Sequence, residues 1–274
     1  MRIVAVIQAR TASTRLPKKV LLPVAGRPLL ELMLTRVRAS QQLDDVVIAT
    51  TTTSADDSIR TLADQIGVRC ISGHPNDLLD RHRQAADAMD ADVVVKIPSD
   101  CPLVDPRVID EVVGAYRRHS AHYDFVSNLH PATWPDGNDV EVIPRGVLEE
   151  AWRHASKQFE REHTSPFIWD RPERFRLGNV LHPDGIDQSL EYRLTLDYED
   201  DYRLIAAVFE AFARPEPSVF SVAEIVAFLD ARPDIVALNA RYRGRGWVDG
   251  HLHELKTLRQ RLEQRDALQE LASP

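Results

Sequence analysis

A group of cationic and hydroxyl side chains occupies residues 10–19, directly after an apolar run near the start of the chain. Its members are Arg10, Ser13, Thr14, Arg15, Lys18 and Lys19. Guanidinium groups bind phosphate oxygens in pairs, ammonium groups add a point charge, and hydroxyl and backbone N–H groups complete such sites. The composition predicts a phosphate-binding loop. An exposed basic loop without a ligand is the simpler alternative.

Two carboxylates follow other apolar runs, at places where a metal ion could meet the phosphates. Asp100 comes after residues 92–97, and Asp197 ends the run 191–196. Mg²⁺ in proteins is held by one or two carboxylates, with phosphates and water filling its other positions. The pair predicts a magnesium site. Helix capping is the alternative for Asp100, although Asp105 suits that role better.

The elements that must position these groups alternate between strand and helix. Nearly continuous β-branched runs, typical of strands buried in a parallel sheet, occupy residues 3–8, 46–50 and 92–97. Helical patterns occupy residues 28–40, 54–66 and 76–89. The predicted fold class is therefore α/β, a doubly wound, mostly parallel Rossmann-like sheet. Such sheets bind ligands at the carboxyl ends of their strands.

The second part of the chain has a different rhythm, with long polar loops. A loop at 128–140 precedes a predicted strand at 140–143 and a helix at 145–156. A strand is predicted at 191–196 and a helix at 199–213, whose first-turn acids suit the helix dipole. Leucines at helical spacing in 250–271 predict an amphipathic helix, packed on its own chain or on a second subunit.

Composition narrows the function further. The chain has 274 residues and a net charge of −8, so we expect no nucleic acid partner, which would need a basic face. The opening apolar run is too short for a leader or a membrane span, so we expect a cytoplasmic protein without a membrane partner. Cys70 and Cys101 lack metal-ligand spacing and are expected to be buried thiols.

Other chemistry finds little support in the residues. The chain contains no GxxxxGK[ST], and Gly244-Arg-Gly246 follows no predicted strand, so both common glycine-rich nucleotide motifs fail. His163 is a candidate base or ligand, but a lone histidine is more often structural, and no catalytic role is assigned to it.

The ordered motifs resemble those of the CMP-sugar synthetases, the CMP-KDO and acylneuraminate cytidylyltransferases, and above all their spore-coat polysaccharide biosynthesis branch. The resemblance covers most of residues 1–210. The motifs are Ile7-Gln-Ala-Arg-Thr-Ala-Ser-Thr-Arg-Leu-Pro-Lys-Lys-Val-Leu, Gly26-Arg-Pro-Leu, Pro98-Ser-Asp-Cys-Pro-Leu-Val-Asp, Asp139-Val-Glu-Val-Ile143, Arg161-Glu-His-Thr-Ser-Pro-Phe-Ile and Arg193-Leu-Thr-Leu-Asp-Tyr-Glu-Asp-Asp-Tyr.

The resemblance implies a role for each matching residue. Arg10 and Lys19 would be catalytic, stabilising charge on the α-phosphate and on the leaving pyrophosphate, and Asp100 and Asp197 would bind Mg²⁺. Asp139 and Glu141 would hold the acceptor. The nucleotide-binding residues it implies are Ala9, Arg10, Ser13, Arg15, Lys19, Arg81, Pro98 and Asp100.

Two departures from the CMP-KDO pattern bear on the nucleobase. Lys18 replaces a small residue, and Pro98-Ser99 stands where those enzymes have Gln-Gly next to the base. The resemblance further implies a nucleotidyltransferase domain over 1–235 and a homodimer, with an acceptor and dimerisation insert at about 128–190. A helical extension over 236–274 would follow.

The expected reaction is transfer of CMP from CTP to an acidic sugar or a similar small acid, with release of pyrophosphate. Two alternatives remain open. A glycosyltransferase of related fold would use a nucleotide-sugar donor, commonly with an Asp-x-Asp motif, which Asp100-Cys-Pro lacks. An inactive nucleotide-binding protein would bind CTP without chemistry.

Overall fold

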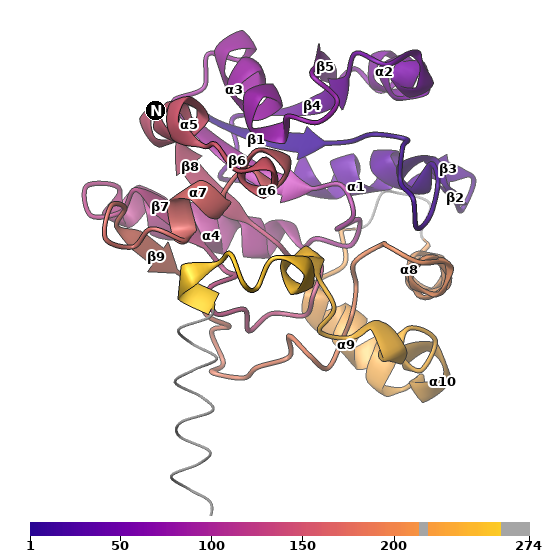
Figure 1. The fold of residues 1–274 in the computed structure, drawn as a ribbon. Coiled ribbons are helices and arrows are strands. Elements are labelled where there is room, and N and C mark those ends of the chain that lie inside the picture. Colours follow the sequence, from indigo (N-terminus) through magenta and orange to yellow (C-terminus); the bar gives the residue numbers. More distant parts are fainter. Residues whose placement is uncertain (214–218, 259–274) are drawn as a thin grey trace, which may run out of the picture.

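The computed structural model describes residues 1–213 and 219–258, in which one central sheet carries helices on both faces (Figure 1). Its strand order is β5-β4-β1-β6-β8-β7-β9, and a separate antiparallel pair is β2-β3. The strands are β1 Ile3–Gln8, β2 Pro23–Val24, β3 Arg27–Pro28, β4 Asp45–Thr51, β5 Arg69–Gly73, β6 Val93–Pro98, β7 Phe125–Ser127, β8 Glu141–Pro144 and β9 Leu177–Asn179.

The half of the sheet that carries the cationic loop is parallel. β1 pairs in parallel with β4 and with β6, and β4 pairs in parallel with β5. Gln8 at the end of β1 lies opposite Pro98 at the end of β6, so the residues that follow both strands emerge side by side. The three strands predicted from β-branched runs are therefore confirmed, and the carboxyl ends of β1 and β6 lie at the same edge of the sheet.

The other half of the sheet is mixed. β8 is antiparallel to β6 and β7, and β9 is parallel to β7. The predicted strand at 140–143 is confirmed as β8, and the predicted α/β class, doubly wound and mostly parallel, is confirmed as well.

Helices cover both faces of the sheet (Figure 1). The predicted helices at 28–40, 54–66, 76–89, 145–156 and 199–213 are confirmed as α1, α2, α3, α5 and α8, with ends shifted by a few residues. No helix in the described part of the chain is long and apolar enough to cross a membrane. The helices are α1 Leu29–Val37, α2 Asp57–Gln65, α3 Leu78–Ala88, α4 Pro106–His119, α5 Arg145–His154, α6 Gln158–His163, α7 Pro166–Trp169, α8 Glu199–Ala211, α9 Val222–Asp230 and α10 Pro233–Val236.

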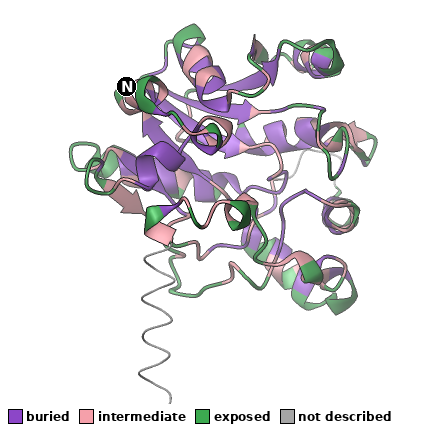
Figure 2. Ribbon diagram, viewed as in Figure 1, coloured by how far each residue is buried: buried purple, intermediate pink, exposed green. Residues whose placement is uncertain are grey.

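The core consists of two layers, one on each side of the sheet (Figure 2, purple). Successive side chains of a strand point to opposite faces, so Ile3 and Ile7 pack with α1, α4 and α8, whereas Val4 and Val6 pack with α3, α5 and α7. Burial on both faces explains why the first strands are continuously apolar.

The predicted strand at 191–196 is wrong. Within this segment Arg193 makes only an isolated bridge to Asp136. The Leu194 N–H donates to the Asp136 carbonyl and the Leu196 N–H donates to the Asp100 carbonyl, both at 2.7 Å. In a strand, these N–H groups would all donate to one neighbouring strand, but here they donate to two different loops. The alternation of apolar residues therefore reflects the packing of a connecting segment.

The C-terminal segment packs on its own chain as far as it is described. Residues 251–255 form turns and irregular structure, and Leu255 is completely buried in the core layer of α3, α5 and α7. The Asp170 carboxylate accepts hydrogen bonds from the Lys256 and Thr257 N–H groups. Most of the helix predicted at 250–271 lies outside the described residues.

Candidate active site

The loop after β1 is held by a buried carboxylate, Asp56, from the short helical turn that follows the neighbouring strand β4. Asp56 accepts hydrogen bonds at 2.7 Å from both the N–H and the hydroxyl of Thr11. Burial alone would raise the pKa of Asp56, but hydrogen bonds from Thr51 and Thr11 outweigh it and lower the pKa. The carbonyl of Thr11 in turn accepts from the N–H groups of Ser13 and Lys18. The loop is therefore folded in advance.

Several cationic groups of this loop face outward. Arg10 is exposed and has no hydrogen bond or ion pair within residues 1–213 and 219–258. Lys18 is exposed as well and has φ 56°, a left-handed conformation that favours glycine. The Ser13 hydroxyl accepts a bond from the Leu16 N–H at 3.3 Å, which leaves its proton available to another acceptor. These groups have unused donors.

Lys19 joins the loop to both predicted metal-binding carboxylates. Its Nζ lies 3.2 Å from Asp100 Oδ2, 2.9 Å from Asp197 Oδ1 and 2.7 Å from the Leu196 carbonyl. Burial alone would lower the pKa of Lys19, but the charges of Asp100 and Asp197 outweigh it and raise the pKa. Three segments far apart in the sequence thus converge on one ammonium group.

The two oxygens of Asp197 face different partners. Oδ1 binds Lys19 and also Nη2 of Arg15, at 2.6 Å, whereas Oδ2 binds Nη2 of Arg193 at 3.2 Å. Burial alone would raise the pKa of Asp197, but the charges of Lys19, Arg15 and Arg193 outweigh it and keep the pKa low. The carboxylate is therefore ionised and can bind a cation.

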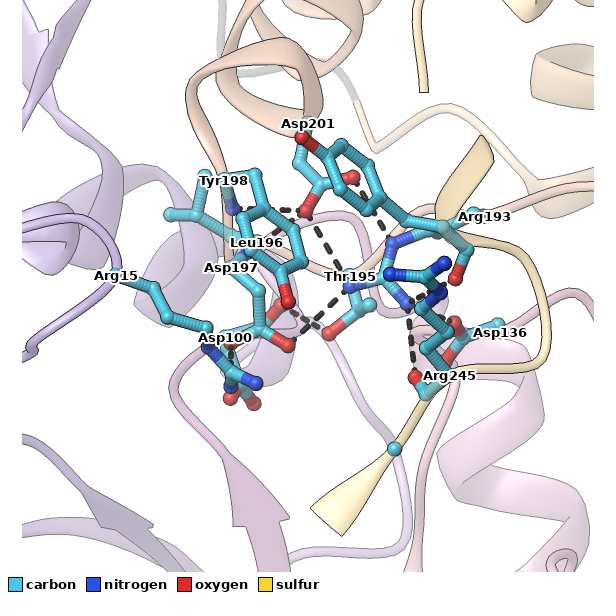
Figure 3. A network of polar contacts seen from close by, with 12 residues as sticks. Arg15, Asp100, Asp136, Arg193, Thr195, Leu196, Asp197, Tyr198, Asp201 and Arg245 are labelled. Carbon is cyan, nitrogen blue, oxygen red and sulfur yellow. Dashed lines mark hydrogen bonds and ion pairs between the residues drawn. The ribbon is translucent and has the colours of Figure 1, made fainter. Parts of the chain in front are cut away.

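Sequence reasoning missed the cluster behind Asp197 (Figure 3). Arg193 Nε lies 3.0 Å from Asp201 Oδ1, and Nη1 lies 3.2 Å from Asp136 Oδ2. Asp201 belongs to the first turn of α8, as predicted, but its side chain is fully buried in this cluster. The residue types did not predict this cluster, because an arginine that alternates with apolar residues is expected to point toward solvent.

The loop at 128–140 approaches this segment closely at Gly137. A Cβ there would lie 2.6 Å from the Leu194 carbonyl carbon and 2.8 Å from Thr195 N, and its φ is +102°. Only glycine tolerates both conditions. The close approach brings Asp136 to Arg193.

Three further predicted nucleotide-binding residues lie on β6, directly after β1 and on α3. Ala9 follows β1 and is buried, and Pro98 ends β6 directly opposite Gln8. Arg81 lies on α3, where its Nη1 donates to the carbonyls of His74 and Pro75. Burial, and next the charge of Arg10, lower the pKa of Arg81 to about 10. Arg81 therefore lies within the electrostatic range of the cationic loop.

The predicted acceptor-binding acids lie on the β8 side. Glu141 is 2% exposed, and its two oxygens pair with the Lys96 ammonium and the Ser165 hydroxyl. Burial, and next the charge of Asp100, raise the pKa of Asp139. The two acids therefore differ. Both oxygens of Glu141 are bound to buried partners, whereas the pKa of Asp139 responds to the charge of Asp100 at the predicted metal site.

His163 stacks on Trp247, with ring centroids 3.8 Å apart and an interplanar angle of 14°. Burial, and next the charge of Lys96, lower the pKa of His163 to about 3, so its ring is neutral near pH 7. This environment is that of a packed structural histidine.

Comparison with known proteins identifies the family of this chain. A family model described as Cytidylyltransferase matches residues 4–214. The spore coat polysaccharide biosynthesis protein SpsF of Bacillus subtilis is 31% identical over 237 residues, 85% of this chain and 95% of that protein. The 3-deoxy-manno-octulosonate cytidylyltransferase of Geobacter metallireducens is 30% identical over 113 residues, 41% of this chain and 44% of that protein.

A solved structure shows the same fold over nearly the whole chain. The structure of a cytidylyltransferase from Leptospira borgpetersenii has a TM-score of 0.81 and 30% sequence identity, and the match covers 90% of this chain and 98% of that chain. The predicted resemblance is thereby confirmed. The chain belongs to the cytidylyltransferase family and is a CTP-dependent nucleotidyltransferase.

Proposed function

We propose that the enzyme transfers CMP from CTP to an acidic sugar or a similar small acid and releases pyrophosphate. The observation that carries the proposal is the position of Lys19 Nζ, between Asp100 and Asp197 and at the base of a loop with unused cationic donors. Such a site neutralises a triphosphate and a metal ion together, which is what nucleotidyl transfer requires.

The cationic residues would act on the phosphates. Arg10, Ser13 and Arg15 belong to the loop that follows β1 and would contribute two guanidinium groups and a hydroxyl. An acceptor oxygen would attack the α-phosphorus in line, with Arg10 and Lys19 stabilising charge on the α-phosphate and the leaving pyrophosphate. No covalent enzyme intermediate is needed, because positioning and charge neutralisation lower the barrier.

Asp100 and Asp197 fit a magnesium ion by the chemistry of their donors. Their oxygens converge on one ammonium group, and hard carboxylate oxygens are what Mg²⁺ prefers. Within the described residues no group of three or more His, Cys, Asp or Glu side chains is arranged around one metal. The triphosphate and water would complete the coordination, and the ion would supply Lewis acidity at the α-phosphate.

The remaining predicted residues would hold the two substrates at either side of the phosphates. Ala9, Arg81 and Pro98 border the place expected for the cytidine. Asp139 and Glu141 border the place expected for the acceptor. The Geobacter metallireducens relative, named for 3-deoxy-manno-octulosonate, supports an acidic sugar as acceptor.

A homodimer is proposed on the surface of the 128–190 insert. Three of its large apolar side chains are exposed, Leu181 at 53%, Ile186 at 44% and Leu190 at 65%. A second copy of the chain would cover them, as the resemblance implies. Sedimentation of an Ile186→Asp variant, compared with the natural chain, tests this, and an unchanged dimer would contradict it.

The function is tested by a pyrophosphate-release screen that crosses four nucleoside triphosphates with acidic sugars and phosphonates in the presence of Mg²⁺. We expect release only with CTP and an acidic acceptor. Release of a nucleoside diphosphate from a nucleotide-sugar would favour a glycosyltransferase. Binding of CTP without pyrophosphate release across the panel would favour an inactive nucleotide-binding protein.

A further inference from the structure

Arg193 occupies a position unlike that of any cation in the loop after β1. Its side chain is 1% exposed and lies among the carboxylates of Asp136, Asp197 and Asp201 (Figure 3). Burial alone would lower the pKa of Arg193, but the hydrogen bond and charge of Asp201 outweigh it and raise the pKa. A guanidinium so enclosed has no donor left for a substrate.

Residues from the C-terminal part of the described chain also bind the Arg193 guanidinium. Nη1 donates to the carbonyls of Tyr242 and Arg245, at 3.3 and 3.2 Å. The Asn239 amide donates to the Arg193 carbonyl and to Asp201 Oδ1, both at 2.9 Å. We name residues 239–245 the C-terminal strap. The strap lies beyond residues 4–214, which the family model matches.

The strap also reaches the residue that follows Asp197. Tyr242 stacks on Tyr198, with ring centroids 3.9 Å apart and an interplanar angle of 10°. The guanidinium carbon of Arg15 lies 5.4 Å from the centroid of the same Tyr198 ring. The strap thus contacts the neighbours of Asp197 at two points, one polar and one aromatic.

The two oxygens of the Asp197 carboxylate have different partners, which indicates what the contacts of the strap do. One oxygen, Oδ2, is anchored by Arg193, and the other, Oδ1, is presented to Lys19 and Arg15. The Asp197 N–H is held as well, because it donates to Asp201 Oδ2 at 2.9 Å. If Arg193 turned, Oδ2 would lose its anchor and the carboxylate would rotate.

We propose that Arg193 is a positioning residue, and that the C-terminal strap, by fixing Arg193, sets the orientation of the Asp197 carboxylate toward the metal and triphosphate. The inference rests on the proposed function, since it gives Asp197 the same ligand. It makes the strap, which contains none of the predicted phosphate-binding or metal-binding residues, necessary for binding of CTP with magnesium. Residues that orient metal ligands typically affect metal affinity by 10- to 100-fold.

The test uses the full chain with two strap variants. Asn239→Ala removes the amide that ties Arg193 to Asp201, and Tyr242→Leu removes the stack on Tyr198 while altering a side chain that is only half-buried. Calorimetry measures CTP affinity with and without Mg²⁺. We expect about a tenfold loss with Mg²⁺ and less than about a twofold change without it.

A matched control separates positioning from general stability. Ser221→Ala removes the N-cap of α9, whose hydroxyl accepts from the Glu224 N–H, and it does not touch the strap. The control should lower the melting temperature and leave both CTP affinities unchanged. Unchanged CTP affinity with Mg²⁺ in a folded strap variant, Tyr242→Leu in the first place, would overturn the inference.

Failure of the proposed function gives a different result. If the natural chain itself did not bind CTP, or bound it equally well with and without Mg²⁺, the assignment of Asp197 to the metal would be wrong, and the proposal for the strap would be rejected with it. If the natural chain bound CTP more tightly with Mg²⁺, but both strap variants lost the same affinity with and without Mg²⁺, only the proposal for the strap would be rejected.

Discussion

The two arginines that bind Asp197 share the same chemical group but differ in exposure and in the number of their partners. Arg15 is 46% exposed and binds one carboxylate oxygen from the loop side, whereas Arg193 is 1% exposed and binds the other oxygen from inside. Arg10 is exposed without a partner in the described part of the chain. The exposed Arg10 and Arg15 keep unused donors, which suits the phosphate contacts proposed for them, whereas the enclosed Arg193 uses all of its donors.

The energetic reason lies in desolvation. A buried guanidinium has lost its water and must recover that cost from fixed acceptors, which is why carboxylates and backbone carbonyls surround Arg193. An exposed guanidinium stays hydrated and exchanges water for phosphate oxygens when a ligand arrives. The difference predicts opposite responses to substitution.

The largest effect is expected for Arg193→Ala. Removing it leaves Asp136, Asp197 and Asp201 close together and without their shared cation, which costs about 3–5 kcal/mol of unfolding free energy. Urea unfolding followed by circular dichroism measures the change. Arg15→Ala is the matched control and should cost less than about 1 kcal/mol. Equal losses in the two variants would break the comparison.

Lys19→Ala tests the site between the two sides. Both carboxylates lose their common ammonium, so we expect turnover at saturating CTP and Mg²⁺ to fall by roughly 10²- to 10³-fold. The unfolding free energy should also fall, because Asp100 loses its cation, but by less than for Arg193→Ala, because Asp197 keeps Arg15 and Arg193. Steady-state pyrophosphate release with the acceptor found in the screen measures the effect. Full turnover would show that Lys19 is not catalytic.

Arg10→Ala should affect only the ligand. Because Arg10 has no partner within residues 1–213 and 219–258, the melting temperature should be unchanged, while CTP affinity falls by about tenfold through loss of a charge-assisted phosphate contact. Calorimetric titration with CTP and Mg²⁺ measures the loss. Arg38→Ala, an exposed arginine away from the loop, serves as the control. A drop in stability without a loss of affinity would assign Arg10 to structure.

The last prediction concerns pH and the fully buried His82 on α3. Burial, opposed in part by the Leu78 carbonyl, lowers the pKa of His82 to about 3. Between that pH and about 6.5 the unfolded chain binds a proton that the folded chain does not, so stability falls as pH decreases, by about 1.4 kcal/mol per pH unit.

His82→Asn keeps a donor for the Leu78 carbonyl, which His82 Nδ1 contacts at 2.8 Å, and removes the titrating ring. The slope of unfolding free energy against pH from 6 to 4 should therefore become flatter by one proton. His154→Asn, at an exposed position, is the matched control. A slope that stays the same in both variants would show that burial does not keep His82 neutral.

Much of the site could be predicted because it depends on strand ends. The β-branched runs of β1 and β6 indicated parallel strands, and parallel neighbours place Arg10 and Asp100 at the same edge whatever the loops do. Lys19 and Asp100 meet at this edge, whereas Asp197 reaches them from an irregular segment, because the strand predicted at 191–196 does not form. Whether a residue follows the end of a buried strand depends on its neighbours in the chain, so the sequence alone can predict it.

The interior partners could not be predicted in this way. Arg193 lies in a segment that alternates like a strand, and Asn239 lies in a segment without any motif. Whether their side chains face water or each other depends on how the loop with Gly137 and the C-terminal strap close around them. Such long-range closure has no periodic signal along the chain.

The sequence alone predicted the α/β class, a mostly parallel sheet, and a cationic loop and Asp100 at neighbouring strand ends. Short-range apolar patterns and the rule for carboxyl ends suffice for that. Only the tertiary structure decided which cations stay free and which are enclosed. Burial and complete hydrogen bonding arise from segments far apart in the chain, as for Arg193 between Asp136, Asp201 and the strap.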